Sequence, residues 1–115
     1  MKLNDPSLFR EAAFLAGEWV PAAGEVQEIL NPANGQLVGR VPAVPAGEVR
    51  ATIRKAEAAF RTWREHTGKE RAAVLRRWAD LMLAHAVDLA SIMTAEQGKP
   101  LAEARGEIAY AASFL

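Results

Sequence analysis

The residues best suited to acid–base chemistry are two carboxylates near the C-terminus. Glu103 and Glu107 lie four positions apart in a segment of helical character, so they share a helix face on which a carboxylate pair could exchange protons with a substrate. A solvated face explains the same spacing, since Arg105 lies between them. The two histidines are His66, in a polar helix-end sequence, and His85, at the edge of an apolar stripe. Neither has a second ligand at a metal-binding spacing, and a partly buried packing role suits His85.

Several kinds of active site are excluded by what the sequence lacks. The 115 residues contain no cysteine, which excludes disulfides, zinc–thiolate sites and a cysteine nucleophile within this chain. There is no Gly-x-Gly-x-x-Gly segment after a strand, no P-loop and no Gly-x-Ser-x-Gly. The 14 basic and 14 acidic residues cancel, so charge gives no reason to expect a nucleic-acid or membrane partner. The residues alone therefore indicate a helical module without a self-contained active site.

The elements that would position these residues change in character near residue 45. Five of the six prolines lie within residues 1–45, and they break this part of the chain into short pieces. Three pieces are predicted strands: 14–20, 25–30 and 37–41. Pro, Gly and Asn supply turns between them, so the simplest prediction is one antiparallel meander. Residues 4–13 are expected to form a short helix with Asn4 or Asp5 near its cap.

Residues 46–115 are predicted to be helical. The first helix repeats its apolar residues every three or four positions, at Val49, Ile53, Ala56, Phe60 and Trp63. Thr67 can cap a second helix that begins near Lys69 and centres its apolar stripe on Trp78, which we expect in the core. This helix either continues or breaks near Val87, where Asp88 is available to cap a new start.

The last predicted helix follows a stop at Gly98. Pro100 suits its first position, where a missing N–H costs nothing, and its apolar side is expected to run through Leu115. The expected fold is an α+β fragment, mainly α, with a β meander in residues 1–45 followed by three or four helices in 46–115. Exposed Ile108, Phe114 and Leu115 would make the isolated chain self-associate.

Four blocks of sequence together resemble a known family. In order, they are NPANGQLVGRVP (31–42), AFRTWR (59–64), KERAAVLRRWADLM (69–82) and EQGKPLAEARGEIAYAASF (96–114). Their order and spacing resemble the N-terminal part of aldehyde dehydrogenases, and the opening and closing blocks are most similar to the succinate-semialdehyde dehydrogenase branch.

The resemblance implies an N-terminal piece, truncated within the helix from Pro100, of the nucleotide-binding domain of a protein several times longer. In the family, a cysteine thiolate attacks the aldehyde, hydride passes to NAD or NADP, and a glutamate-activated water hydrolyses the thioester. Those residues would follow Leu115, so this chain is expected to hold no catalytic or cofactor-binding residue and to be inactive alone. The parent is expected to oxidise succinate semialdehyde to succinate with NAD or NADP.

Two weaker site predictions follow from the resemblance. Some family members bind a structural monovalent cation, and the matching positions here are the carbonyls of Ile29 and Leu30 and the carboxylate of Glu96. Glu96 facing water is the alternative. The matching helix also lies near the substrate entrance in the family, so Lys99 and Glu103 are predicted to face that entrance.

The alternative to an enzyme fragment is a stand-alone helical module that binds a partner through its third helix. For the parent, the resemblance implies a small-molecule aldehyde substrate and a homo-oligomer. No apolar run approaches the roughly 20 residues of a membrane span. Asp5, Arg10 and Glu11 interrupt the apolar residues at the N-terminus, so a cytoplasmic location is expected.

Overall fold

The computed structural model describes all 115 residues as four strands followed by four helices. The elements in chain order are a 3₁₀ turn η1 (Pro6–Leu8), β1 (Ala12–Leu15), β2 (Glu18–Pro21), β3 (Val26–Leu30), β4 (Leu37–Pro42), α1 (Ala46–Trp63), α2 (Gly68–Ala84), α3 (Ala86–Gln97) and α4 (Leu101–Ala112). The mainly helical α+β class is therefore confirmed. The strands form two separate hairpins, β1–β2 and β3–β4, so the single meander is wrong.

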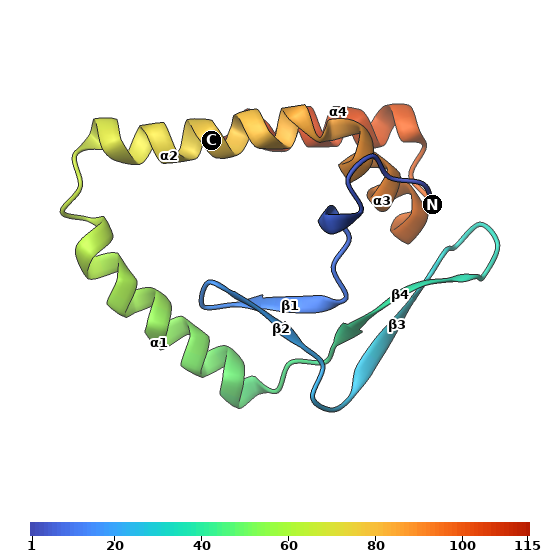
Figure 1. Cartoon of the computed structure of the whole chain (residues 1–115), viewed down its shortest axis with the longest axis horizontal. Helices are drawn as coiled ribbons and strands as arrows, with labels where there is room; N and C mark the ends of the chain where they lie inside the picture. The colour runs from blue at the N-terminus through green and yellow to red at the C-terminus, as the bar shows by residue number, and fades with distance from the viewer.

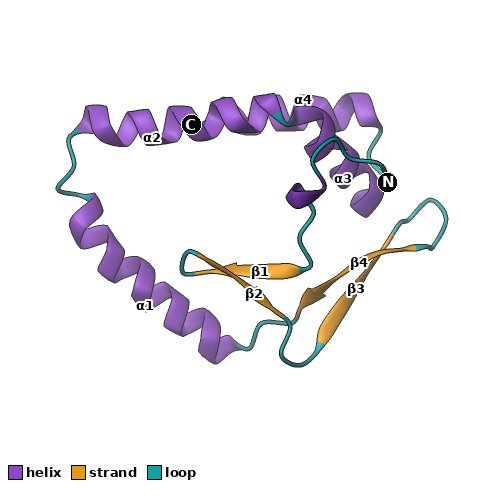
Figure 2. Ribbon diagram, in the orientation of Figure 1, coloured by secondary structure: helices purple, strands orange, loops and turns teal.

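The chain has an open, flat shape. Figure 1 shows α2 and α4 along one edge, α1 down one side and the hairpins opposite the helices, and Figure 2 shows how the helices and strands separate. The Cα radius of gyration is 16.5 Å, whereas a compact chain of this length has about 13 Å. The extents of 49 × 34 × 19 Å fit the same description. Most elements consequently lack a second layer to pack against.

The first hairpin replaces the strand predicted at 14–20. Ala16 and Gly17 form a two-residue turn with φ values of 52° and 92°, and β1 and β2 pair Phe14 with Trp19. Two consecutive positive φ values match the twist of a tight hairpin. The prediction of one strand failed because Ala-Gly is a weaker turn signal than Asn-Gly.

The second hairpin matches the predicted strands at 25–30 and 37–41 closely. Its turn is built on Asn31, whose side-chain oxygen accepts a hydrogen bond from the backbone N–H of Ala33 at 2.9 Å. Gly35 supplies a φ of 70° in the same turn. The register shifts between Ile29 and Leu30, where the pairing with β4 becomes irregular.

The helix predicted at 4–13 is only the single turn η1. Asp5 does cap it, because its carboxylate accepts from the N–H of Ser7 at 2.9 Å. The following residues turn toward β4 instead of continuing a helix. Glu11 accepts from the backbone N–H of Arg40 at 2.7 Å, so this segment bridges two parts of the fold.

The helix boundaries largely follow the predicted capping signals. Thr67 and Glu70 form a reciprocal capping box at the start of α2. The break before α3 falls at His85, but the prediction that Asp88 caps α3 is wrong, because its carboxylate bonds the N-terminal segment instead. Gly98 ends α3 in the left-handed conformation, with φ 75°, as predicted.

The last helix is shorter than expected. Pro100 is its N-cap rather than its first residue, and α4 ends at Ala112, so the expectation that it runs through Leu115 is wrong. The hydroxyl of Ser113 donates to the carbonyl of Tyr110 at 2.7 Å. Such a local side-chain bond competes with continuation of a helix.

The core is small and lies between α3 and α4. Ala90 and Ala104 are fully buried and Ile108 is 7% exposed, with Met82 and other half-buried residues packed around them. The prediction that Ile108 is exposed to solvent is therefore wrong. Trp78 is 56% exposed, so its predicted place in a core is wrong for these 115 residues. Small side chains let α3 and α4 approach closely, which explains why alanine dominates this core.

Candidate functional site

The most strongly built polar contact ties the N-terminus to α3. The Asp88 carboxylate, 3% exposed, accepts from the backbone N–H and the side-chain amide of Asn4, each at 3.0 Å, and from the backbone N–H of Asp5 at 2.8 Å. These bonds, chiefly that from the Asn4 backbone, lower the pKa of Asp88. Because hydrogen bonds to a charged acceptor are stronger than neutral ones, Asp88 anchors the N-terminal segment.

The other end of this segment is held by the second hairpin. A Cβ added at Gly39 would lie 2.6 Å from the Phe9 ring, so only glycine lets the ring approach β4 this closely. The Glu11 bond to Arg40 lies beside this contact. The N-terminal segment therefore connects α3 to β4, and it encloses a hollow between them.

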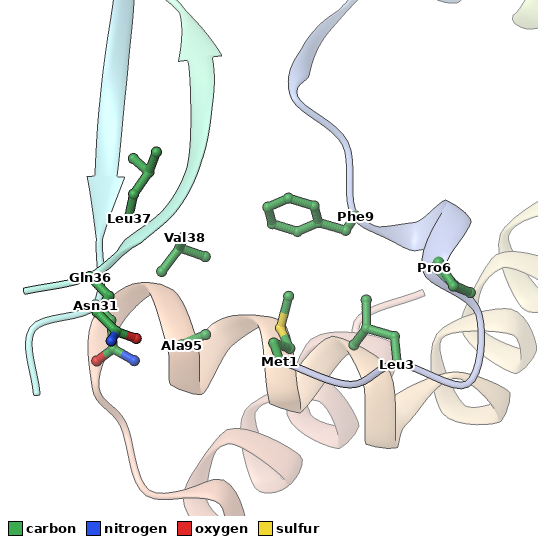
Figure 3. Close-up of a pocket in the computed structure, with 9 residues that line it drawn as sticks. All are labelled: Met1, Leu3, Pro6, Phe9, Asn31, Gln36, Leu37, Val38 and Ala95. Atoms are coloured by element: carbon green, nitrogen blue, oxygen red, sulfur yellow. The ribbon is translucent and has the colours of Figure 1, made fainter. Parts of the chain in front are cut away.

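The hollow has a volume of about 370 Å³. Figure 3 shows its lining side chains, which come from the N-terminal segment, the β3–β4 turn with the start of β4, and α3. They are Met1, Leu3, Pro6, Phe9, Asn31, Gln36, Leu37, Val38 and Ala95. None of the nine side chains carries a charge, so no side chain of the hollow can form an ion pair with a substrate carboxylate or a cofactor phosphate. It suits apolar packing better than acid–base chemistry.

The predicted cation ligands lie in two segments that the fold brings close together. A Cβ added at Gly98 would lie 2.8 Å from Cγ of Pro32, so the end of α3 touches the turn that follows Ile29 and Leu30. Glu96, on the last turn of α3, forms no hydrogen bond or ion pair within the chain. Desolvation raises its pKa. A free carboxylate near this turn is compatible with the predicted site, which stays a prediction.

No cluster of acidic, histidine or cysteine side chains in the chain could hold a metal ion. The predicted cation site would therefore depend on backbone carbonyls with a single carboxylate, which suits a weakly held monovalent ion better than a transition metal. His66 is exposed beside Trp63, with ring centroids 5.8 Å apart, and His85 is half-buried, as expected.

The two carboxylates considered for acid–base chemistry have different surroundings, because only one of them forms an ion pair. Lys99 Nζ lies 2.5 Å from Glu107 Oε1, so Glu107 is paired while Glu103 remains exposed in the first turn of α4. An acidic residue at that position is favourable with the helix dipole. The two carboxylates therefore do not act as a coupled dyad here. The prediction that Lys99 and Glu103 face a substrate entrance is not tested by this arrangement.

Two polar features were not recognised from the sequence. One is the binding role of Asp88, for which an acidic residue inside the apolar stretch 86–93 was the available signal. The other is Thr94, whose buried hydroxyl has no hydrogen-bond partner. No sequence signal identifies such an orphan group, because it depends on which neighbours happen to enclose it.

A model of the aldehyde dehydrogenase family matches residues 19–115. The chain belongs to the aldehyde dehydrogenase family. This finding confirms the resemblance seen in the four sequence blocks. No helix of this family member is long and apolar enough to cross a membrane.

Individual relatives match the chain along its whole length. It is 56% identical over 116 residues to an NADP(+) succinate-semialdehyde dehydrogenase of Escherichia coli K12, and 54% identical to a glutarate-semialdehyde dehydrogenase of Pseudomonas aeruginosa. The chain covers 24% of each of these proteins. A solved succinate-semialdehyde dehydrogenase from Burkholderia pseudomallei superposes with a TM-score of 0.94 at 53% identity, over 99% of this chain and 24% of that one. The chain thus spans about a quarter of the length of its relatives.

Proposed function

We propose that these residues are the N-terminal part of an NADP- or NAD-dependent enzyme that oxidises succinate semialdehyde to succinate through a cysteine thioester. The observation that carries the proposal is 56% identity along the whole chain to a relative named for this activity. The structural match to a protein of the same name supports it, since a TM-score of 0.94 includes both hairpins and all four helices.

Residues 1–115 do not form a binding site that would suit NAD or NADP. A dinucleotide binds at the carboxyl ends of parallel strands beside a helix N-terminus, and both sheets here are two-stranded and antiparallel. The 370 Å³ hollow has no charged side chain in its lining to bind a phosphate. The proposal therefore assigns cofactor binding and the reacting cysteine to residues outside 1–115. Within the enzyme, this chain contributes structure.

The proposed substrate class is an aldehyde with a carboxylate at its far end. The relatives above are named for succinate and glutarate semialdehydes, which share this group and differ in chain length. A buried carboxylate without a cationic or hydrogen-bonding partner would be costly, so the enzyme needs such an anchor. A site built around it rejects a substrate that lacks the group, because the anchor is then left unpaired.

The test compares kcat/KM of the longer protein for succinate semialdehyde and for butyraldehyde, which has the same chain length without the carboxylate. We expect a preference of at least about tenfold for succinate semialdehyde, equivalent to about 1.4 kcal/mol. Equal values would contradict the proposed substrate class and leave the family assignment intact. Higher kcat/KM for glutarate semialdehyde than for succinate semialdehyde would assign the enzyme to the longer substrate.

The cation site is a second part of the proposal. We expect Ile29 and Leu30 to present carbonyls, with Glu96, to a monovalent cation, and Lys99 and Glu103 to lie near the substrate entrance. Replacing potassium by choline at constant ionic strength should lower the melting temperature of the longer protein. Glu96→Gln should remove this dependence, whereas Glu103→Gln should retain it. An unchanged dependence in Glu96→Gln would exclude Glu96 as a ligand.

The location and assembly of the whole protein complete the proposal. We expect a homo-oligomer in the cytoplasm, to be checked by gel filtration with light scattering and by cell fractionation. The intact mass of the native protein separates the enzyme from the alternative of a stand-alone helical module. A mass near the 12.5 kDa of this chain would favour the module.

A further inference from the structure

The β3–β4 hairpin meets the helices of this chain at few points. No strand packs closely on a helix within residues 1–115. The turn after β3 touches the end of α3, where Pro32 lies against Gly98. The N-terminal segment, residues 1–11, makes the other connection, because it is bound to α3 at one end and to β4 at the other. Within residues 1–115, the position of the hairpin against α3 therefore depends on this segment.

The contact of the segment with β4 lies directly opposite a predicted cation ligand. The Phe9 ring packs against Gly39, and Gly39 is the register partner of Ile29 on β3. The register shifts between Ile29 and Leu30, the other residue predicted to present a carbonyl. Such an irregularity leaves part of the ladder unpaired and bends the strand locally. Contacts from outside the hairpin, such as that of Phe9, therefore help to set where these two carbonyls lie.

The other end of the segment is bound to the helix that carries the predicted carboxylate ligand. Asp88 is 3% exposed and accepts hydrogen bonds from Asn4 and Asp5. Glu96 follows on the same helix, eight positions later and about 12 Å further along its axis. A helix moves as a rigid element over this distance. The segment is consequently attached to both parts of the chain that the cation site would need.

The first residue of the segment lies where the hairpin turn and the end of α3 meet. Met1 lines the 370 Å³ hollow and also an adjoining hollow of about 420 Å³, in both cases together with Asn31 and Ala95. Figure 3 shows these three side chains around the first hollow. Asn31 directly follows Leu30, and Ala95 directly precedes Glu96. The segment therefore lies beside both groups of predicted ligands without supplying one of them.

We propose that the N-terminal segment positions the two halves of the cation site against each other, with Asp88 as the positioning residue on α3. The bound segment holds β4, and with it the carbonyls of Ile29 and Leu30, against the end of α3 that carries Glu96. This inference rests on the cation site of the proposed function and is independent of the substrate. Coupling between two binding events is reciprocal, so the segment is in turn bound more tightly when the cation is present.

The coupling is tested in the longer protein by replacing choline with potassium at constant ionic strength and following the melting temperature. For Asp88→Ala, we expect the potassium concentration that gives half-maximal stabilisation to rise about fivefold or more, which is the lower end of typical coupling between sites. Asn4→Ala removes only the side-chain bond to Asp88 and should give a smaller rise, so it decides the question if Asp88→Ala fails to fold. Thr67→Ala, which removes the capping box of α2, is the control. It should lower the melting temperature and leave this potassium concentration unchanged.

The reciprocal effect is measured by amide hydrogen exchange in the wild-type longer protein. Potassium should slow exchange of the Asn4 and Asp5 amides, which donate to Asp88, by a factor similar to the shift in Asp88→Ala. If potassium stabilises the wild type but either response is missing, or if Thr67→Ala shifts as much as Asp88→Ala, only this inference is overturned. If the wild type has no potassium dependence, the cation site and this inference both fail, while the kinetic test of the substrate is unaffected.

Discussion

Asp88 shows how one side chain holds two distant segments together. It lies in the first turn of α3 and accepts three hydrogen bonds from Asn4 and Asp5, which are 84 and 83 positions away. Asp88→Ala should release the N-terminal segment, lower the melting temperature and speed amide hydrogen exchange on residues 2–9. Asp88→Asn, which keeps the shape but removes the charge, should have a smaller effect in the same direction. Unchanged exchange in both variants would show that the segment is held elsewhere.

The pH dependence of this contact has a defined sign. Hydrogen bonds to Asp88 lower its folded-state pKa, so the stabilisation is fully present above the unfolded-state pKa of about 3.9 and is lost as pH falls through the folded-state pKa. Asp5 and Glu70 shift in the same direction, Asp5 chiefly through Ser7 and Glu70 chiefly through Thr67. Asp88→Ala should therefore lose less stability than the wild type between pH 5 and pH 2 in thermal melts.

Gly98 and Gly35 form a matched pair for measuring a tertiary contact. Both have positive φ, 75° and 70°, but a Cβ at Gly98 would lie 2.8 Å from Pro32 while one at Gly35 would meet nothing within 4 Å. Gly35→Ala should cost about 1–2 kcal/mol through the left-handed backbone alone. Gly98→Ala should cost about 1–3 kcal/mol more, because the Pro32 ring must move. Urea denaturation measures the free energy of unfolding of both variants. Equal losses of stability would mean that the Pro32 ring moves aside without an energetic cost.

In the first hairpin, one turn residue has a strained backbone conformation that a substitution can relieve. Ala16 has a φ of 52°, which a residue with a Cβ adopts at a cost of about 1–2 kcal/mol. Asn tolerates this conformation, so Ala16→Asn should stabilise the protein by about 0.5–1 kcal/mol. Ala13→Asn, within β1, should lower stability instead. A lower melting temperature for Ala16→Asn would show that the turn is not the two-residue type described.

The same hairpin also displays an aromatic surface. The rings of Phe14 and Trp19 lie 5.2 Å apart as a cross-strand pair, and the Arg10 guanidinium lies 5.5 Å from the Trp19 ring centre. Both aromatic residues remain exposed. The pair therefore stabilises the hairpin locally, as aromatic cross-strand pairs do, without joining it to a core.

At the scale of the whole molecule, eighteen large hydrophobic side chains are exposed while the core holds three closely packed buried residues. We expect the isolated chain to self-associate through α1 and Phe114 rather than through buried Ile108, because each large apolar side chain left in water forgoes roughly 1.5–3 kcal/mol. Light scattering after gel filtration should show dimers or larger species.

A matched pair on α1 tests the surface responsible for association. Phe60→Ser should weaken association, whereas Ala58→Ser, on the opposite side of α1, should leave it unchanged. A monomer at all concentrations, or equal effects of the two substitutions, would contradict this expectation. The isolated chain should also form no NADPH or NADH with succinate semialdehyde, since it contains no cysteine to attack the aldehyde.

Local signals in the sequence determined where most elements begin and end. The Thr67 cap, the left-handed Gly98 and the turn at 31–35 each depend on hydrogen bonds or φ values within a few residues, so their residue types sufficed to predict them, whereas the part of Glu70 in the cap was seen only in the structure. The family assignment also came from the sequence, because four blocks with fixed order and spacing are a specific signal.

Contacts between residues far apart in the chain determine which of the predicted faces are buried. A periodic stripe shows that a helix has an apolar side, but Trp78 on α2 is exposed while Ala104 on α4 is fully buried. Burial depends on which surface lies opposite, and that surface is set by contacts between residues far apart in the chain. The same reason explains Asp88, whose sequence position suits a helix cap but whose carboxylate meets Asn4 and Asp5 because the N-terminal segment crosses α3.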